Sequence, residues 1–440
     1  MALPASPRTI SAEEAAALVR PGDSVDYGFG LGQPDLFDRA LASRRDELRG
    51  VTIRAALSLR PRAVLEADPD GRAFEWLNWH FSSYDRRQHD RGRAHYIPMN
   101  FGEAPDDYRR FIDPVDVVCL KTAPMDEHGW FNFGAAVTYH AALVERAKNV
   151  VVEVSEAMPR VHGLENAVHA SRVHGVIRGD SAPLAELPNP APSETDRAVA
   201  RLIAAEVEDG SCLQIGIGAM PNAVCALLRE AGVRDLGVHT EMLVDGMIDL
   251  VEAGVVTGAR KQVDPGTIVF TFAAGSKRQY DFIDRNPGVS ARAVDSTNLP
   301  HVIMRNDRVV SINNTTEIDL QGQAASESAG HRHLTGTGGQ LQFVRGAYAS
   351  RGGKSFMCLS STWERDGIRK SRIVPELAAG NIVTTPRTDV MYVVTEHGLV
   401  NLKGKSVPER ARALISIAHP DFREGLERAA FERRLLPRRT

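Results

Sequence analysis

The sequence has little of several features that mark specialised proteins. Its four cysteines, Cys119, Cys212, Cys225 and Cys358, have no CxxC spacing, so we predict neither a disulfide framework nor a zinc site. It has no uncharged run of about eighteen apolar residues, which a membrane-spanning helix requires. The first residues, MALPASPRTISAEEAA, lack the apolar core of a signal peptide. We therefore expect a cytoplasmic protein with no membrane partner.

Charge of either sign is not in excess. Lys and Arg total 53, and Asp and Glu total 56, which gives a formal net charge of −3. A chain this close to neutral does not predict a nucleic-acid partner. The 14 histidines show no ligand spacing joined to a fixed carboxylate, and the HExxH and GxSxG motifs are missing. These absences argue against a metal site, metal-dependent hydrolysis and serine hydrolysis.

What the chain does have is material for two domains. Its 440 residues exceed what one hydrophobic core usually supports, and 43% of them are hydrophobic. The stretch LPNPAPS at 187–193 holds three prolines and predicts a stiff connector, so we expect domains at 1–187 and 194–440. Apolar strands such as 149–154 alternate with helical segments, which predicts an α/β protein with parallel-rich open sheets flanked by helices.

Two stretches of the chain repeat one order of elements. Each has a strand, a glycine turn, a helix and a second strand, first from residue 22 and again from residue 210. Three glycines recur at an offset of 188 residues, and a proline and another glycine at 187, so we infer a tandem duplication. A chance similarity of two α/β units is the alternative. The matched pairs are Gly22 with Gly210, Gly28 with Gly216, Gly30 with Gly218, Pro34 with Pro221, and Gly50 with Gly237.

The second copy is the stretch around which we expect the functional site. We predict a strand at 212–215, a glycine turn at 216–218, a helix from about 221 to 229 and a strand ending at Glu241. Such a turn suits an anion such as phosphate, although glycines there also serve packing. Glu241 falls where open α/β sheets place reacting groups, and its counterpart in the first copy is Arg54. A carboxylate present in one copy alone indicates a role beyond folding, with divergence of a surface position as the alternative.

Other segments have two interpretations each. The glycine loop 336–339 offers backbone donors for an oxyanion or for a pantetheine chain, or it is a plain tight turn. Asn313, at the end of the apolar strand 309–312, is a second possible oxyanion donor or an ordinary strand-end amide. The polar and aromatic segment 80–92 predicts a surface loop that lines a cleft, or a solvated loop without a role.

Sequence motifs are spread over most of the chain. The first half carries APMDEHGWFNFG at 123–134 and MPRVHG at 158–163. The second half carries GIGAMPNAV at 216–224, HTEMLVDG at 239–246, INNTTEIDLQG at 312–322, GTGGQLQFVRGA at 336–347, SRIVPEL at 371–377, VVTEHGLVNLKGKS at 393–406 and ALISIAHPDFREGL at 413–426. Together they resemble the acetyl-CoA hydrolase/CoA-transferase family, and the first two resemble its 4-hydroxybutyrate and butyryl-CoA transferase branch. The resemblance implies two similar domains of the CoA-transferase fold.

This resemblance also implies roles for individual residues. Glu241 would be the nucleophile that attacks an acyl-CoA thioester and then carries CoA. Glu396, in TEHG, competes for that role, and Gln342 departs from the Asp that the family often has there. CoA would be a substrate, with no tightly bound cofactor. Asn313, Gly338 and Gly339 would stabilise oxyanions, Gly216, Gly218, Pro221, Asn222, Gly336 and Gln340 would lie along CoA, and Gly30, Gly32, Gln33 and Pro34 would face the acyl group.

The implied activity is an acyl-CoA:carboxylate CoA-transferase with ping-pong kinetics. The acids that fit are butyrate, 4-hydroxybutyrate, acetate, or a dicarboxylate such as succinate or itaconate. Arg54, Arg86, Arg87 and Arg160 are candidates for binding a second carboxylate, with surface charge as the alternative. An acyl-CoA hydrolase using Glu241, and a non-catalytic CoA-binding regulator, are the competing functions. The family further implies a homo-oligomer, most simply a dimer.

Overall fold

The computed structural model describes residues 7–188, 190–216 and 218–436. The chain forms two compact units, and we describe each by itself. Unit 1 comprises residues 1–188 and 269–297, and unit 2 comprises residues 189–268 and 298–440. The domains expected from the sequence were two continuous segments, 1–187 and 194–440. In the structure, residues 269–297 belong to unit 1 together with the first half of the chain. Residue 189, within the predicted connector, lies outside the described residues.

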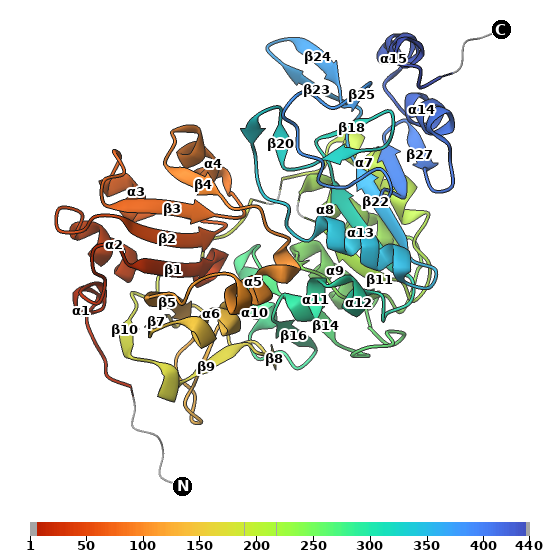
Figure 1. The fold of residues 1–440 in the computed structure, drawn as a ribbon. Helices are drawn as coiled ribbons and strands as arrows, with labels where there is room; N and C mark the ends of the chain where they lie inside the picture. The colour runs from red at the N-terminus through yellow and green to blue at the C-terminus, as the bar shows by residue number, and fades with distance from the viewer. Residues whose placement is uncertain (1–6, 189, 217, 437–440) are drawn as a thin grey trace. The chain divides into compact units, whose positions relative to one another are not determined.

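Unit 1 is built on a seven-stranded parallel sheet in the order β10-β7-β5-β1-β2-β3-β4 (Figure 1). Tyr27 and Trp76 are fully buried on the face that helices α1 to α4 cover. Asp26 points to the opposite face, where Tyr108 of α5 donates a hydrogen bond to it. The strands are β1 Ser24–Phe29, β2 Val51–Ala56, β3 Phe74–Asn78, β4 Ala94–Tyr96, β5 Val117–Thr122, β7 Asn149–Val154 and β10 Gly175–Arg178; the helices are α1 Ala12–Ala16, α2 Leu36–Ser43, α3 Ala63–Ala67, α4 Ser83–Asp90, α5 Ala104–Arg110 and α6 His140–Arg146.

Unit 2 is built on a six-stranded sheet in the order β12-β11-β17-β22-β26-β27, in which only β27 runs antiparallel to its neighbour. Helices α14 and α15 contribute Leu414 and Leu426 to a core that also holds Val393 of β26. The strands are β11 Cys212–Ile215, β12 Gly237–Val238, β17 Val309–Asn314, β22 Lys354–Cys358, β26 Tyr392–Thr395 and β27 Gly398–Asn401; the helices are α7 Glu194–Ala204, α8 Ala219–Glu230, α9 Asp245–Glu252, α12 Pro300–Ile303, α13 Gln340–Ala349, α14 Val407–Ser416 and α15 Pro420–Glu432.

The two sheets repeat the same strand order. Five parallel strands run β2-β1-β5-β7-β10 in unit 1 and β12-β11-β17-β22-β26 in unit 2. The residue pairing between the central strands is also equivalent. Val25 of β1 lies opposite Val117 of β5 in unit 1, and Leu213 of β11 lies opposite Val310 of β17 in unit 2. The predicted fold class, two similar α/β domains with parallel-rich sheets, is confirmed.

Residues 269–297 join unit 1 through a small second sheet. Strand β16 pairs in parallel with β8, with Ala291 opposite Gly163. A Cβ at Gly163 would overlap the backbone of Ala291, so the close approach of the two strands requires glycine there. The elements of this part are β8 Gly163–Leu164, β14 Ile268–Phe270, β15 Phe272–Ala273, α10 Lys277–Ile283, β16 Val289–Arg292 and α11 Asp295–Asn298.

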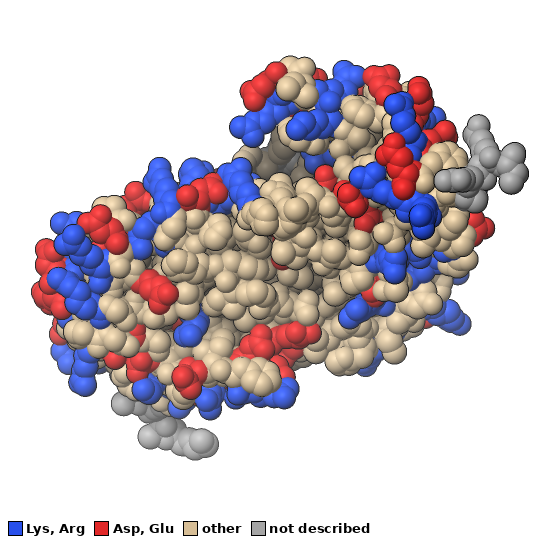
Figure 2. All heavy atoms as spheres, turned by 45° about the horizontal axis from the view of Figure 1, so that its top comes forward, with Lys and Arg blue, Asp and Glu red and all other residues tan. Residues whose placement is uncertain are grey.

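Shorter elements complete the two units. Lys and Arg are interspersed with Asp and Glu over the face that Figure 2 shows, in keeping with the small net charge. No helix within the described residues is long and apolar enough to cross a membrane. The remaining elements are η1 Gly30–Gly32, η2 Phe101–Glu103, β6 Trp130–Asn132, β9 Ala167–His169, η3 Ala170–Arg172, β13 Met242–Leu243, β18 Glu317–Asp319, β19 Ala324–Ala325, β20 Ser328–Ala329, β21 Arg332–His333, β23 Thr362–Arg365, β24 Ile368–Ser371 and β25 Ile373–Val374.

The segment 80–92 is a correction to the sequence prediction of a loop. Residues Ser83–Asp90 form helix α4, whose capping box joins Ser82 and Asp85. Tyr84 and Gln88, four residues apart, are buried on one face of that helix. The sequence did not reveal the helix because its buried face is polar. Tyr84 and Gln88 are buried while each donates a hydrogen bond to Glu66.

Candidate active site

Glu241 lies just beyond the edge strand of the sheet of unit 2. Strand β12 ends at Val238, and the N–H of His239 still donates to the carbonyl oxygen of Leu213 at 3.1 Å. The hydroxyl of Thr240 donates to the carbonyl oxygen of Met242 at 3.0 Å and fixes the turn around Glu241. The partly buried carboxylate is thus held at the carboxyl end of the parallel strands, as predicted from the sequence.

Two donors from distant parts of the chain reach the Glu241 carboxylate. Nδ2 of Asn298, the last residue of α11, donates to Oε2 at 2.5 Å. The backbone N–H of Gly339 lies close enough to the same carboxylate to lower its pKa. Gly339 is the N-cap of α13, so the carboxylate also lies at the positive end of that helix dipole.

Burial changes the protonation of this carboxylate. It raises the pKa of Glu241 from 4.5 to about 7, while the hydrogen bonds from Asn298 and Gly339 act in the lowering direction. A glutamate with a pKa near 7 is a stronger nucleophile than an ordinary one, yet it is half ionised at neutral pH. The site therefore suits covalent chemistry at a carboxylate.

The rate at limiting substrate is expected to rise with pH through about 7, since only ionised Glu241 attacks. Asn298→Ala removes a hydrogen bond that lowers the pKa of Glu241, so the rising limb should move to higher pH. The same change should reduce kcat about 100- to 1,000-fold, as loss of one oxyanion donor does elsewhere. The measurement is the pH profile of kcat/KM for both proteins. An unmoved limb with an unchanged kcat would contradict a direct role for Asn298.

Gly339 leaves no room for a side chain. A Cβ on it would overlap Oε2 of Glu241 and Nδ2 of Asn298. Gly338, beside it, has φ of +55°, a left-handed conformation that favours glycine. Gly336 is buried in the same loop. The glycine loop predicted from the sequence therefore brings the backbone N–H of Gly339 to Glu241. Glycine at 339 avoids a steric overlap with the carboxylate, and glycine at 338 permits the left-handed backbone.

Asn313 is not brought to Glu241 within the described part of the chain. Its Nδ2 donates to Oε1 of Gln214 at 3.0 Å and to Oγ of Ser311 at 3.0 Å, which uses both amide hydrogens. Asn298, and not Asn313, donates a hydrogen bond to the Glu241 carboxylate in the structure, and the oxyanion role of Asn313 stays a prediction. Asn298 gave no local signal, since it ends a helix of only four residues.

The turn between β11 and α8 has the properties of a ligand-binding turn. Gly218 has φ of +125° and is the N-cap of α8. A Cβ on Gly216 would meet only ordinary contacts, at 3.7 Å from the carbonyl oxygen of Ile312, so packing does not require this glycine. Pro221 is buried and Asn222 half-buried in the first turns of α8. Residue 217, part of the predicted glycine turn, lies outside the described residues.

The corresponding turn in unit 1 is filled by the chain itself. The carboxylate of Glu153 accepts from the N–H groups of Asp35, Leu36 and Phe37 at 2.9 to 3.0 Å, and so occupies the N-terminus of α2. By the matched strand registers, the residue of β22 that corresponds to Glu153 is Cys358. The duplicated turn therefore accepts a carboxylate in unit 1, whereas unit 2 has a buried thiol in place of that carboxylate.

A histidine explains the glycines of the first turn. A Cβ at Gly28 would lie 2.5 Å from Nε2 of His140, and one at Gly32 would lie 2.6 Å from its Cε1. The N–H of Phe29 donates to Nε2 of His140 at 3.0 Å. Burial lowers the pKa of His140 to about 3. The glycines of unit 1 thus serve packing, which was the alternative interpretation of the turn.

The loop predicted to face an acyl group is buried in unit 1. Gly30 and Gly32 bound η1, and Pro34 is buried beside Gln33, whose Nε2 donates to the carbonyl oxygen of Ala56 at 2.9 Å. Of the predicted CoA contacts in unit 2, Gln340 uses its amide on Ser326 at 2.9 Å and Thr385 at 3.1 Å. Arg160, one of the four arginines proposed for a second carboxylate, pairs with Asp126 at 3.1 Å.

Glu396, the competing nucleophile, is held at the turn between β26 and β27. Its carboxylate accepts from the N–H of Ser361 at 2.8 Å and from the hydroxyl of Ser361 at 2.5 Å, and it lies 3.6 Å from Nε2 of His397. Only 16% of this side chain is exposed. Glu241 differs in its setting, because it lies beside the N-cap of α13, where the helix dipole favours negative charge.

Metal ligands do not gather elsewhere. Across residues 7–188, 190–216 and 218–436, no group of three or more His, Cys, Asp and Glu is arranged to hold a metal ion. All four cysteines are buried and reduced, and burial raises the pKa of Cys212 to about 11. Thiolate chemistry at Cys212 is therefore disfavoured at neutral pH.

Comparison with known proteins matches both halves of the chain. The acetyl-CoA hydrolase/transferase N-terminal domain matches residues 6–188, and the C-terminal domain of the same family matches residues 275–430. The butyryl-CoA:acetate CoA-transferase of Anaerostipes caccae is 45% identical over 94% of each chain. The succinyl-CoA:cyclohexane-1-carboxylate CoA transferase of Geobacter metallireducens is 46% identical over 96% of this chain and 95% of the relative.

Solved structures agree with this match. The crystal structure of RipA from Yersinia pestis superposes with a TM-score of 0.90 at 37% identity, over 98% of each chain.

An acetyl-CoA hydrolase of Neurospora crassa is more distant, at 28% identity over 72% of this chain and 66% of the relative. The similarity to the two CoA-transferases named above is thus greater and longer than the similarity to this hydrolase.

Proposed function

This chain belongs to the acetyl-CoA hydrolase/transferase family, and from that premise we propose that it is an acyl-CoA:carboxylate CoA-transferase acting through Glu241. The observation that carries the proposal is the contact of the Glu241 carboxylate with Nδ2 of Asn298 and the N–H of Gly339. CoA-transferases at 38–46% identity have names that give butyrate, 4-hydroxybutyrate, acetate, succinyl-CoA or cyclohexane-1-carboxylate as substrates. A short-chain acid is accordingly the substrate class that we propose here.

Two covalent steps carry CoA onto the enzyme. An oxygen of Glu241 attacks the thioester carbonyl carbon, the carbon–sulfur bond breaks, and an acyl–glutamyl anhydride and CoA thiolate form. The thiolate then attacks the glutamyl carbonyl carbon, which releases the first carboxylate and leaves a glutamyl–CoA thioester. An acceptor carboxylate reverses both steps. No water is consumed, so the energy of the thioester passes to the new acid.

Asn298 and Gly339 have a defined part in these steps. Each attack on the glutamyl carbonyl places negative charge on an oxygen of residue 241, where both donors already lie. Donors fixed before the reaction stabilise that charge without reorganisation. The N-terminus of α13 adds a favourable dipole at the same point. We propose Asn298 and Gly339, rather than Asn313, as the oxyanion-stabilising pair.

CoA is proposed to lie along the turn at Gly216 and Gly218. The support comes from unit 1, where the duplicated turn and helix N-terminus accept the carboxylate of Glu153. Cys358 replaces that carboxylate in unit 2, so an anionic or polar part of CoA can take its place at α8. Pro221 and Asn222 lie in the first turn of α8, which begins at Ala219, and Gly336 lies in the loop before Gly339. The proposal includes CoA as substrate, without a tightly bound cofactor.

The balance between transfer and hydrolysis has a direct test. With butyryl-CoA and acetate, we expect acetyl-CoA to form at least about 100-fold faster than free CoA appears without acetate, because the anhydride and thioester must be kept from water. The measurement is CoA release and acyl exchange with and without the acceptor, with initial rates crossed in both substrates to establish ping-pong kinetics. Equal rates would favour the hydrolase. Absence of turnover with a panel of acyl-CoAs would favour a CoA-binding regulator.

We also propose a cytoplasmic homodimer. The family resemblance implies a homo-oligomer. The mass of the protein in solution, measured by light scattering after size exclusion, checks the oligomeric state against the 48.0 kDa chain.

A further inference from the structure

The glycine loop beside Glu241 has few side chains of its own. Gly336, Gly338 and Gly339 have none to pack against their neighbours. Glycine is also the residue whose backbone loses the most conformational freedom on folding. A donor on such a loop serves a reacting group only if contacts from elsewhere hold it, because a misplacement of about 1 Å costs on the order of 100-fold in rate. The contacts that hold this loop are therefore part of the site.

Glu327 holds the loop on one side of the two glycines at 338–339. It lies between β19 and β20, and only 3% of it is exposed. Its Oε2 accepts from the hydroxyl of Thr337 at 3.0 Å, and its Oε1 accepts from the hydroxyl of Thr384 at 2.9 Å. Its carbonyl oxygen accepts from the N–H of Leu334 at 2.8 Å, just before the loop. A carboxylate offers each threonine hydroxyl an oxygen of its own, which the single side-chain oxygen of glutamine does not.

Gln340 holds the loop on the other side. It is the first residue of α13, and its Nε2 donates to Oγ of Ser326 at 2.9 Å and to Oγ1 of Thr385 at 3.1 Å. Ser326 precedes Glu327, so the same segment between β19 and β20 holds the loop on both sides. These hydrogen bonds of Glu327 and Gln340 are the two anchors of the loop, and residues 338–339 lie between them.

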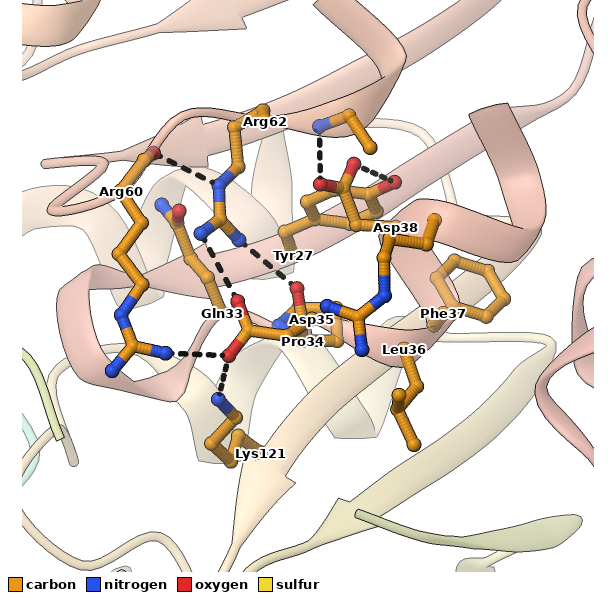
Figure 3. A network of polar contacts seen from close by, with 12 residues as sticks. Tyr27, Gln33, Pro34, Asp35, Leu36, Phe37, Asp38, Arg60, Arg62 and Lys121 are labelled. Carbon is orange, nitrogen blue, oxygen red and sulfur yellow. Dashed lines mark hydrogen bonds and ion pairs between the residues drawn. The ribbon is translucent and has the colours of Figure 1, made fainter. Parts of the chain in front are cut away.

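Unit 1 holds the start of a helix in a different way. Asp35, the N-cap of α2, pairs with three cationic side chains (Figure 3), and the carboxylate of Glu153 takes up the N-terminus of that helix. In unit 2 the anchors are side chains on both sides of the glycines, so the N-cap of α13, Gly339, is left to Glu241. The cations around Asp35 are Arg60 at 3.0 Å, Arg62 at 3.2 Å and Lys121.

We propose that Glu327 and Gln340 are positioning residues that hold the N–H of Gly339 at the carboxylate of Glu241. This rests on the proposed function, in which that N–H stabilises negative charge on residue 241. Burial, Asn298 and Gly339 set the pKa of Glu241, and no charged side chain of the described residues contributes to its shift. Glu327 therefore acts through the position of the loop and not through its charge.

Thr337→Val tests the anchor at Glu327 without altering either positioning residue. The variant keeps the size of the side chain and loses its hydroxyl, so the loop is held at Gln340 alone. We expect kcat with butyryl-CoA and acetate to fall about 10-fold, less than for a donor that is removed outright. The rising limb of the pH profile of kcat/KM should move to higher pH, because the N–H of Gly339 lowers the pKa of Glu241. Thr337→Ser keeps the hydroxyl and should restore both values.

Two further variants separate positioning from general stability. Gln340→Met removes the second anchor, and it should lower kcat and move the limb in the same direction. Thr271→Val, in unit 1, removes a hydroxyl that donates to the carbonyl oxygen of Arg292 at 2.7 Å, from a side chain that is fully buried. It should lower Tm and leave kcat and the limb unchanged. An unchanged kcat with an unmoved limb in both Thr337→Val and Gln340→Met, or equal shifts in Thr271→Val, would overturn the proposal.

A measurement without turnover keeps this proposal apart from the proposed function. Infrared difference spectra between the protein and its Glu241→Gln variant follow the protonation of the Glu241 carboxyl group as pH changes. The pKa of that group should rise when Thr337→Val is introduced into both proteins. If no acid accepts CoA, the transferase proposal fails while the titration still tests the anchors. A pKa of Glu241 that Thr337→Val leaves in place would refute the positioning roles.

Discussion

Replacing Glu241 with alanine is expected to lower kcat for CoA transfer by at least about 10⁴-fold, because the nucleophile of both covalent steps is lost. The assay uses butyryl-CoA as donor and acetate as acceptor. Intact-protein mass spectrometry provides the second readout. After incubation with butyryl-CoA alone, the wild-type protein should gain one CoA that hydroxylamine removes, and the alanine variant should gain none. Near-normal transfer by Glu241→Ala would exclude this residue as the nucleophile.

Glu396→Gln is the matched control for that experiment. Glu396 is the competing candidate, and its carboxylate is bound by Ser361 at 2.8 and 2.5 Å. We expect this variant to form the CoA adduct still, and peptide mapping should place the adduct on residue 241. An adduct that persists in Glu241→Ala and disappears in Glu396→Gln would move the nucleophile to Glu396.

Glu241→Gln also shows what the buried carboxylate does to stability. The pKa of Glu241 is about 7 in the folded protein and about 4.5 unfolded, so the folded state binds more protons between those values. Stability is therefore lost as pH rises through that window. Glutamine carries no such penalty, so the difference in Tm between Glu241→Gln and wild type should be small at pH 4.5 and larger at pH 8. A constant difference would mean that the pKa of Glu241 is close to its ordinary value.

Gly339→Ala should lower kcat about 100-fold although it adds one methyl group. The new Cβ would overlap Oε2 of Glu241 and Nδ2 of Asn298, so the carboxylate must move. A misplacement of about 1 Å at a reacting group costs on the order of 100-fold in rate. The backbone of Gly339, at φ −100° and ψ 6°, is open to alanine, so the effect should come from the site and not from strain. The measurement is kcat for transfer together with Tm.

Gly425→Ala is the control for Gly339→Ala. Gly425 lies in α15, and a Cβ there meets nothing within 4 Å among the described residues. This change should leave kcat unaltered and raise the free energy of unfolding by about 0.5–1 kcal/mol, as alanine does in a helix interior. If Gly339→Ala kept normal kcat with normal Tm, the tight contact between residue 339 and Glu241 would be wrong.

Local sequence signals predicted much of the fold. The strand at 149–154 and the strand at 212–215 were predicted at the bounds that β7 and β11 have. Capping boxes join Ser11 to Glu14 at α1 and Ser193 to Asp196 at α7, residues that are only three apart in the sequence. Helix ends were less certain, since the helix predicted from about 221 to 229 begins at Ala219 and ends at Glu230. The repeat was also local information, because it needs only the spacing of glycines and prolines.

The sequence by itself determined the two-sheet α/β architecture and the family, and it gave the proposal of Glu241 as nucleophile, because each depends on patterns within a few tens of residues. Only the tertiary structure decided which groups surround that carboxylate. Asn298 lies 57 positions from Glu241 and reaches it through the packing of α11, while Asn313 turns to Gln214 on the neighbouring strand. The same holds for Glu153, which fills the N-terminus of α2 from 116 to 118 positions away. Hydrogen bonds between distant segments follow from how helices and strands pack, and no local pattern records that packing.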